Sequence, residues 1–171
     1  ISASSDKTLR VWDLATGESR VLRGHGDAIS RVLLSPDGKT IASASRDKTL
    51  RLWDLATGTS RVLTGHESMI QDIAFSPDGK ALASASLDRT ARLWDTSSGA
   101  VQVLASNDGG LYATAFSPGG GLLATVSDGA VARIWNVATG ESRALRGHVD
   151  AARHGVFSPD GRTLATASKI G

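Results

Sequence analysis

The sequence contains no cysteine, and this absence removes several classes of chemistry. Without a thiol, the chain has no disulfide framework, no thiolate nucleophile and no cysteine ligand for zinc. The absence fits a reducing compartment, so we expect a cytoplasmic protein. No apolar run approaches the roughly 20 residues that cross a bilayer, and no charged and then apolar signal stands at the start. We therefore expect no membrane anchor in this stretch of chain.

The sequence also lacks a large excess of positive or of negative charge. The 19 lysines and arginines are interleaved with 17 aspartates and glutamates, which leaves a net charge of only +2. The field that would attract nucleic acid or an anionic membrane surface is therefore absent, and we expect neither as a partner. With 171 residues, 40% of them apolar, the chain is long enough to bury a sizeable core.

One short sequence recurs four times at a constant spacing. The tryptophans are 41 residues apart, and each lies in a variant of RLWDLATG: Trp12, Trp53, Trp94 and Trp135. The turn sequence SPDG, replaced once by SPGG, and the pair GH, replaced once by SN, keep the same spacing. A fixed period of this length is typical of stacked or radial repeat architectures.

Within one period the residues alternate as they do in strands. The pattern predicts four strands, over residues 29–35, 40–45, 49–54 and 59–64. A helix would need apolar residues at helical spacing, which these segments lack. Each period therefore predicts one small antiparallel sheet. Because a single sheet cannot bury both of its faces, the sheets must pack on one another in a linear stack or in a ring.

Four strands per unit, the GH pair and the Trp-Asp pair that ends the third strand resemble the WD-repeat (WD40) β-propeller family over the whole chain. The near-identical copies are similar to those of bacterial members. The resemblance implies an all-β fold, in which four-stranded antiparallel blades surround a channel. We expect residues 1–171 to form one propeller region of four 41-residue repeats with a seven-residue overlap, incomplete at both ends.

Two arrangements of such a partial propeller remain open. Because propellers of this family have about seven blades, four repeats would leave an open arc with exposed strand edges. The chain is then either part of a longer propeller or one of two copies that assemble into a single ring. The start at Ile1 rather than at methionine favours the first expectation.

A recurring set of polar residues contains every member of a catalytic triad. In the family that the chain resembles, these groups instead form a hydrogen-bonded chain inside each blade, from indole to hydroxyl to imidazole to carboxylate. The two complete sets are His25, Ser43, Asp47 and Trp53, and His66, Ser84, Asp88 and Trp94. Ser45 and Ser86, two residues further on, remain alternatives for the hydroxyl. Because identical sets recur in successive repeats, we expect a structural role and no enzyme activity.

No metal or cofactor is predicted. The SPDG turns supply one carboxylate each, whereas calcium takes six to eight oxygens. His154 aligns with Asp72 and Arg31, which predicts an outward-facing position with no second ligand nearby. The glycines match no nucleotide-binding pattern.

Positions at which the repeats differ are the candidates for partner recognition. In WD-repeat proteins the contact rim consists of the loop after each histidine and the turn before each repeat aspartate. Carried over by position, the loop gives Ala28, Ser30, Met69, Gln71, Gly110, Tyr112, Ala151 and Arg153, and the turn gives Ser5, Arg46, Leu87, Asp128 and Lys169.

From this set we predict a rim that binds a protein or peptide partner through Arg46, Met69, Gln71, Leu87, Tyr112, Arg153 and Lys169. Most of these residue types are common at interfaces. The expected function is that of a non-catalytic interaction scaffold or sensor module. The alternatives are a non-catalytic part of a larger signalling enzyme and a purely structural repeat array.

The third repeat departs from the others. It has Asn107 in place of histidine, Gly129 in place of the repeat aspartate, and Asn136 after the tryptophan. Its internal hydrogen-bond chain therefore cannot form as in its neighbours, and we predict a looser blade with more mobile loops. Asp128 stands one position early, and the sequence leaves open whether it compensates.

Overall fold

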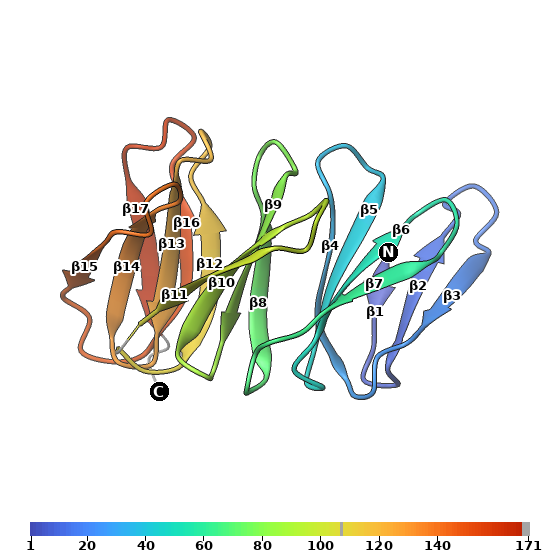
Figure 1. Cartoon of the computed structure of the whole chain (residues 1–171), viewed down its shortest axis with the longest axis horizontal. Helices are drawn as coiled ribbons and strands as arrows, with labels where there is room; N and C mark the ends of the chain where they lie inside the picture. The colour runs from blue at the N-terminus through green and yellow to red at the C-terminus, as the bar shows by residue number, and fades with distance from the viewer. Residues whose placement is uncertain (107, 169–171) are drawn as a thin grey trace.

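All regular structure in the described part of the chain is β-strand. The computed structural model describes residues 1–106 and 108–168, in which seventeen strands form five antiparallel sheets. The sheets follow one another in chain order from one end of the molecule to the other, so that β1 (Ser2–Ala3) and β17 (Leu164–Ser168) lie far apart (Figure 1). The predicted all-β fold of antiparallel blades is confirmed, and it forms a partial propeller rather than a closed barrel. In the described residues no helix has the length and apolarity needed to cross a membrane.

Three sheets are complete four-stranded blades, with the strands hydrogen-bonded in chain order. The first consists of β4 (Ile29–Leu34), β5 (Thr40–Ser45), β6 (Leu50–Asp54) and β7 (Ser60–Leu63). The second consists of β8 (Ile70–Phe75), β9 (Ala81–Ser86), β10 (Thr90–Asp95) and β11 (Val101–Ala105). The third consists of β12 (Leu111–Phe116), β13 (Leu122–Ser127), β14 (Val131–Asn136) and β15 (Ser142–Arg146).

The sheets at the two ends of the molecule have fewer strands. The N-terminal sheet has the order β1 (Ser2–Ala3), β2 (Thr8–Trp12) and β3 (Ser19–Arg23). The C-terminal sheet pairs β16 (Ala152–Phe157) with β17 (Leu164–Ser168). By repeat position, β1 and β17 are both second strands of a blade.

The SPDG turns hold the first and second strands of a blade together. In the first complete blade, Asp37 Oδ1 accepts hydrogen bonds from Ser35 Oγ at 2.5 Å and from the Lys39 amide at 3.0 Å. Gly38 follows at a φ of 72°, a conformation that glycine adopts without strain. The Asp37 carboxylate therefore forms its hydrogen bonds within its own turn.

Each internal sheet buries both of its faces against neighbouring sheets. Trp53 packs in a cluster with Leu9 and Leu22 of the preceding sheet, while Leu50 and Leu52 pack in a second cluster with residues of the following sheet. Full burial of such a side chain stabilises the fold by about 1.5 to 3 kcal/mol. A blade is therefore stable only where it has neighbours.

Polar contacts also connect successive sheets at their outer strands. Arg20 of β3 donates to the carbonyl oxygens of Leu55 and Ala56, in the turn after β6, with a distance of 3.0 Å from Nη1 to Ala56 O. One repeat later, Arg61 of β7 donates to Thr96 O at 2.5 Å and to Ser97 O at 2.7 Å. These two arginines thus connect β3 and β7 to the blade that follows each of them.

At the inner strands an ion pair crosses from one blade to the next. Arg31 Nε donates to Asp72 Oδ1 at 2.9 Å, and Asp72 Oδ2 accepts the Thr114 amide at 3.0 Å. The prediction that this repeat position faces outward is wrong for Asp72. Its side chain is only 14% exposed and bonds to residues of the two neighbouring blades. His154, at the same repeat position in β16, is exposed.

In the described residues 1–106 and 108–168, four non-glycine residues have a positive φ, and they occupy the same position in the turn between the second and third strands. They are Lys7 (72°), Lys48 (70°), Arg89 (70°) and Ala130 (58°). A side chain with a Cβ atom is strained in this conformation by about 1 to 2 kcal/mol, and a β-branched one is a genuine outlier there.

We therefore expect Lys48→Val to lower the free energy of unfolding by about 1 to 2 kcal/mol, although the Lys48 side chain is exposed. Lys48→Gly should leave it nearly unchanged, because relief of strain is offset by the larger entropy of the unfolded chain. Urea unfolding followed by tryptophan fluorescence measures both. Equal stabilities of the two variants would contradict the assignment of strain to this turn.

Candidate functional site

A buried chain of hydrogen bonds runs through the first complete blade. Trp53 Nε1 donates to Ser43 Oγ at 2.8 Å, and Ser43 Oγ lies 2.7 Å from His25 Nε2. His25 Nδ1 lies 2.9 Å from Asp47 Oδ2. Because the serine hydroxyl accepts from the indole, it donates its own hydrogen to Nε2. His25 is therefore the neutral tautomer that carries its proton on Nδ1 and donates it to the carboxylate.

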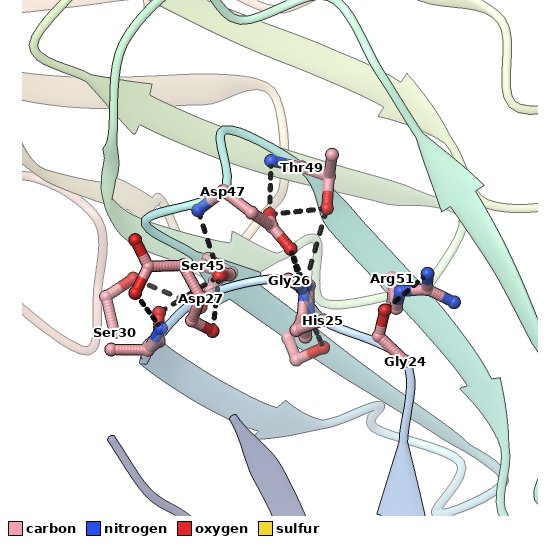
Figure 2. Close-up of polar contacts among 12 residues, drawn as sticks. Gly24, His25, Gly26, Asp27, Ser30, Ser45, Asp47, Thr49 and Arg51 are labelled. Atoms are coloured by element: carbon pink, nitrogen blue, oxygen red, sulfur yellow. Dashed lines mark hydrogen bonds and ion pairs between the residues drawn. The ribbon is translucent and has the colours of Figure 1, made fainter. Parts of the chain in front are cut away.

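Asp47 joins this chain to two backbone segments, as Figure 2 shows. Its Oδ2 also accepts the Gly26 amide at 2.8 Å, while Oδ1 accepts the Thr49 amide at 2.9 Å and the Thr49 hydroxyl at 2.7 Å. Burial alone would raise the pKa of Asp47, but the hydrogen bonds from Thr49, Gly26 and His25 outweigh it and lower the pKa to about 2. The charged carboxylate fastens the loop before β4 to the turn after β5.

The second complete blade repeats the arrangement. Trp94 Nε1 donates to Ser84 Oγ at 2.9 Å, His66 Nε2 lies 2.7 Å from the same oxygen, and His66 Nδ1 lies 2.6 Å from Asp88 Oδ2. The alternative hydroxyls have another task, since Ser45 Oγ donates to the carbonyl oxygens of Asp27 and Ala28, each at 3.0 Å. Ser43 and Ser84 are thus the hydroxyls of the two chains.

The connectivity from serine to histidine to aspartate is that of a catalytic triad, but its setting does not suit catalysis. Ser43 and Ser84 are fully buried, and each hydroxyl is held between a tryptophan and a histidine. A substrate cannot reach such an oxygen. Among the residues that the structure describes, no three histidine, aspartate or glutamate side chains gather to hold a metal ion.

In the third blade the described residues show the first link of the chain. Trp135 Nε1 donates to Thr125 Oγ1 at 2.9 Å, and Asn107 lies outside the described residues. The carboxylate of Asp108 pairs with an arginine of β14, since its Oδ2 accepts Arg133 Nε at 2.9 Å. Asp128 lies close to Gly109 and Gly110. The looser third blade stays a prediction.

Four residues of the predicted rim share a feature that the sequence did not reveal. The first strand of each blade pairs with the second through a register shift, and the residue at the shift is Ser30, Gln71, Tyr112 or Arg153. A β-bulge leaves one residue outside the ladder and turns its side chain away from its normal direction. We call these four residues the bulge row.

Six of the thirteen positions carried over from the family line one hollow. A cavity of about 570 Å³ has among its lining residues six of the predicted positions: Ser5, Ala28, Ser30, Arg46, Met69 and Gln71. Arg46 is exposed, and Gln71 Nε2 lies 3.0 Å from Met69 Sδ. The Ser30 hydroxyl donates to Ile70 O at 2.7 Å, so its side chain also connects two blades. The lining changes from one repeat to the next, unlike the buried hydrogen-bond chains.

The remaining rim residues lie elsewhere. The Arg153 guanidinium stacks on the Tyr112 ring at 3.6 Å, which joins the bulge-row residues of β12 and β16 to each other. Leu87 is half-buried, and its amide donates to Met69 O at 3.2 Å. Lys169 lies outside the described residues. The structure therefore brings Arg46, Met69 and Gln71 together and does not place Tyr112 or Arg153 around the same hollow.

Repeated four-stranded blades, each with a buried indole bonded to a hydroxyl, define a protein of the propeller class. The family model described as WD domain, G-beta repeat matches residues 17–54, 58–95, 99–136 and 140–169, and the chain belongs to this WD40 family. WD40 repeats are in general protein-interaction scaffolds rather than catalysts.

Two curated relatives match a single repeat of the chain. Coronin-7 of Mus musculus is 51% identical over 43 residues, which is 25% of this chain and 5% of the relative. Nuclear distribution protein PAC1 of Coccidioides posadasii is 46% identical over 43 residues, which is 25% of this chain and 9% of the relative. The chain thus matches only a small part of these proteins.

Removal of the Ser43 hydroxyl should destabilise the first complete blade strongly. Ser43→Ala leaves both the Trp53 indole and His25 Nε2 without a partner, at about 1 to 3 kcal/mol for each buried group. Thr125→Val, which among the described residues removes a partner from Trp135 alone, should cost about half as much. Chemical denaturation of the two variants measures the difference, and equal losses would show that the imidazole link adds nothing.

The two buried histidines should make stability depend on pH. Burial lowers the pKa of His25 and of His66, and the hydrogen bond and charge of the paired aspartate only partly oppose this. Below about pH 6.5 the unfolded chain therefore binds protons that the folded chain does not, so stability falls as the pH falls. Asp47 adds a further loss only when the pH falls from about 4 towards its own pKa of about 2.

Urea unfolding between about pH 7.5 and about pH 5.5 measures this dependence. The free energy of unfolding should decrease with pH, and the decrease should be smaller in His66→Gln, which retains one of the two histidines. A rise in stability over this interval would contradict the assignment of neutral, buried imidazoles.

Proposed function

We propose that the face of the molecule around Arg46, Met69 and Gln71 binds a protein or peptide, and that the chain is an interaction scaffold. The observation that carries this proposal is the hollow of about 570 Å³ at this face, lined by residues that differ between repeats. A concave site with a few polar groups is the usual form of a binding pocket. A reducing compartment such as the cytoplasm suits a chain without cysteine.

The chemistry of the lining favours a peptide segment as the partner. Arg46 offers an exposed guanidinium, which recognises carboxylates through paired hydrogen bonds. Met69 adds an unbranched side chain that adapts its shape to a partner. Gln71 supplies both a donor and an acceptor at the bulge. A peptide with an acidic residue beside an apolar one would pair with Arg46, pack on Met69 and exchange backbone hydrogen bonds with Gln71.

The β-bulge is a second argument for a binding role of this face. A bulged residue contributes no regular ladder hydrogen bond, so it can change without loss of the sheet, and bulges are over-represented next to functional sites. Tyr112 and Arg153, which stack on each other, extend the bulge row beyond the hollow. In this proposal they form a second, flatter part of the contact surface.

The alternative function is a purely structural one: a repeat array that binds no particular partner. It is favoured by the near-identity of the copies, because recently duplicated blades need no partner to fold. A further alternative is that the chain is a non-catalytic part of a larger signalling enzyme.

A peptide library displayed on phage and selected against the chain tests the proposal. Selected peptides should lose at least tenfold in affinity for Arg46→Ala/Met69→Ala, since truncation of an interface anchor costs about 1 kcal/mol or more for each residue. The matched control is Lys39→Ala, an exposed basic residue next to the SPDG turn of the same blade. Equal affinities for both variants, with unchanged thermal unfolding, would contradict the proposed site.

A further inference from the structure

The outermost strand of the second complete blade, β11, is an edge strand. It pairs with β10 alone, and no described residue pairs with its other edge. In an antiparallel pair the hydrogen bonds alternate, so every second residue directs its backbone groups away from its partner. The Ser106 amide donates to Arg89 O at one end of this pair, and the Asp95 amide donates to Ala100 O at the other.

These two bonds determine which backbone groups of β11 are turned outward. Alternation from both ends assigns Gln102 and Leu104 to the bonds with β10. Val101, Val103 and Ala105 therefore direct their N–H and C=O groups to the open edge. Their side chains are exposed as well, and the exposed fraction is 44% for Val101 and 48% for Val103. The edge thus presents donors, acceptors and apolar surface in one row.

The sequence of β11 differs from the other outer strands at three positions, and each change removes a polar or charged group. Val101 replaces serine, Gln102 replaces arginine, and Ala105 replaces arginine or threonine. The other outer strands each carry at least one arginine: Arg20 and Arg23 in β3, Arg61 in β7, and Arg143 and Arg146 in β15. Charged side chains are a usual means of preventing an edge strand from pairing with another chain. Strand β11 lacks this protection.

The change at Val101 also removes an acceptor from the neighbouring strand. Nη1 of Arg10, Arg51 and Arg133 donates in each case to the serine of the next strand, at 3.0 Å. Arg92 stands at the same repeat position in β10, where Val101 offers no oxygen. Among the described residues the Arg92 side chain forms no hydrogen bond or ion pair, and its Nε is buried. A half-buried cation without a partner therefore lies directly opposite Val103.

We propose that an extended acidic segment of a partner protein adds a strand to this blade at the edge of β11. Its backbone pairs with the outward groups of Val101, Val103 and Ala105, a general mode of association for open sheet edges. The added residue opposite Val103 lies on the same face as Arg92, about 10 Å from it across two strand spacings. A glutamate and the arginine together bridge this distance. Apolar residues two positions to either side cover Val101 and Ala105.

An acidic segment is the occupant that the charges select. Two copies of β11 could also pair with each other, because the strand has no like charges to oppose. Such a pair contains no carboxylate, however, so both Arg92 side chains would stay without an anion. The hollow of the proposed peptide-binding face is lined by other residues, which include Arg46, Met69 and Gln71. The edge of β11 is therefore a second surface, and it does not rest on the function proposed above.

Two peptides that differ at one residue test the charge. Val-Thr-Glu-Thr-Val places its glutamate opposite Val103, and Val-Thr-Lys-Thr-Val reverses the charge. In fluorescence polarisation with the 171-residue chain, the glutamate peptide should bind about tenfold more tightly, because only it forms the charge-assisted bond. The preference should disappear in Arg92→Gln and persist in Arg46→Ala/Met69→Ala. Equal affinities of the unchanged chain for both peptides would overturn the proposal.

Val103→Pro tests the backbone contact. It removes an outward N–H and no bond to β10, and proline is tolerated at such positions of edge strands. The variant should bind the glutamate peptide about tenfold more weakly. The matched control is Val62→Pro, at the same repeat position in β7, which should leave the affinity unchanged. An equal loss in both variants would contradict pairing at β11.

Amide hydrogen exchange locates the added strand residue by residue. With the glutamate peptide bound, the amides of Val101, Val103 and Ala105 should exchange more slowly. Those of Gln102 and Leu104, already bonded to β10, should change little. Uniform protection, or none, would overturn the proposal. Protection of the outward amides in the concentrated chain without peptide would show that a second copy occupies the edge, and this would overturn it too.

Discussion

A buried indole N–H requires a hydrogen-bond acceptor, and each complete blade of this protein is arranged around that requirement. The acceptor of Trp53 is Ser43, whose own hydrogen goes to His25, whose proton in turn goes to Asp47. Each group fixes the orientation of the next, and an unmet partner would cost about 1 to 3 kcal/mol. The chain ends at a carboxylate that holds a loop and a turn in place, so packing inside the blade determines the geometry of its surface.

The blades in turn depend on one another, because a sheet with two apolar faces is stable only between neighbours. Clusters of leucine and tryptophan fill the space between sheets, and Arg20 and Arg61 connect the outer strands β3 and β7 to the turns of the next blades. This division of tasks leaves the bulge row and the adjacent turn free to vary. In the function proposed above, recognition of a partner falls to residues such as Arg46 and Gln71, which differ between the repeats.

The repeat period and the alternation of residues were sufficient to predict the strands, because both depend on local spacing. The strand predicted over residues 40–45 agrees with β5, and the one predicted over 59–64 is shortened to Ser60–Leu63. The Arg31–Asp72 ion pair was missed, and its position was assigned to the outside, since contacts between sheets depend on the packing angle. The bulges were missed as well. A register shift does not change the alternation of apolar residues in the sequence, so the alternation cannot reveal it. The residues at the shifts were nevertheless among the positions predicted to contact a partner.

The central claim is that the imidazole and carboxylate links stabilise a blade beyond burial alone. Trp53, Trp94 and Trp135 are 2%, 2% and 3% exposed, and each donates to a buried hydroxyl, but only the first two hydroxyls are shown to continue to a histidine and an aspartate. Hydrogen exchange of the three indole protons, followed by NMR, compares them within one molecule. The account predicts slow exchange at Trp53 and Trp94 and faster exchange at Trp135, whereas equal rates at all three would contradict it.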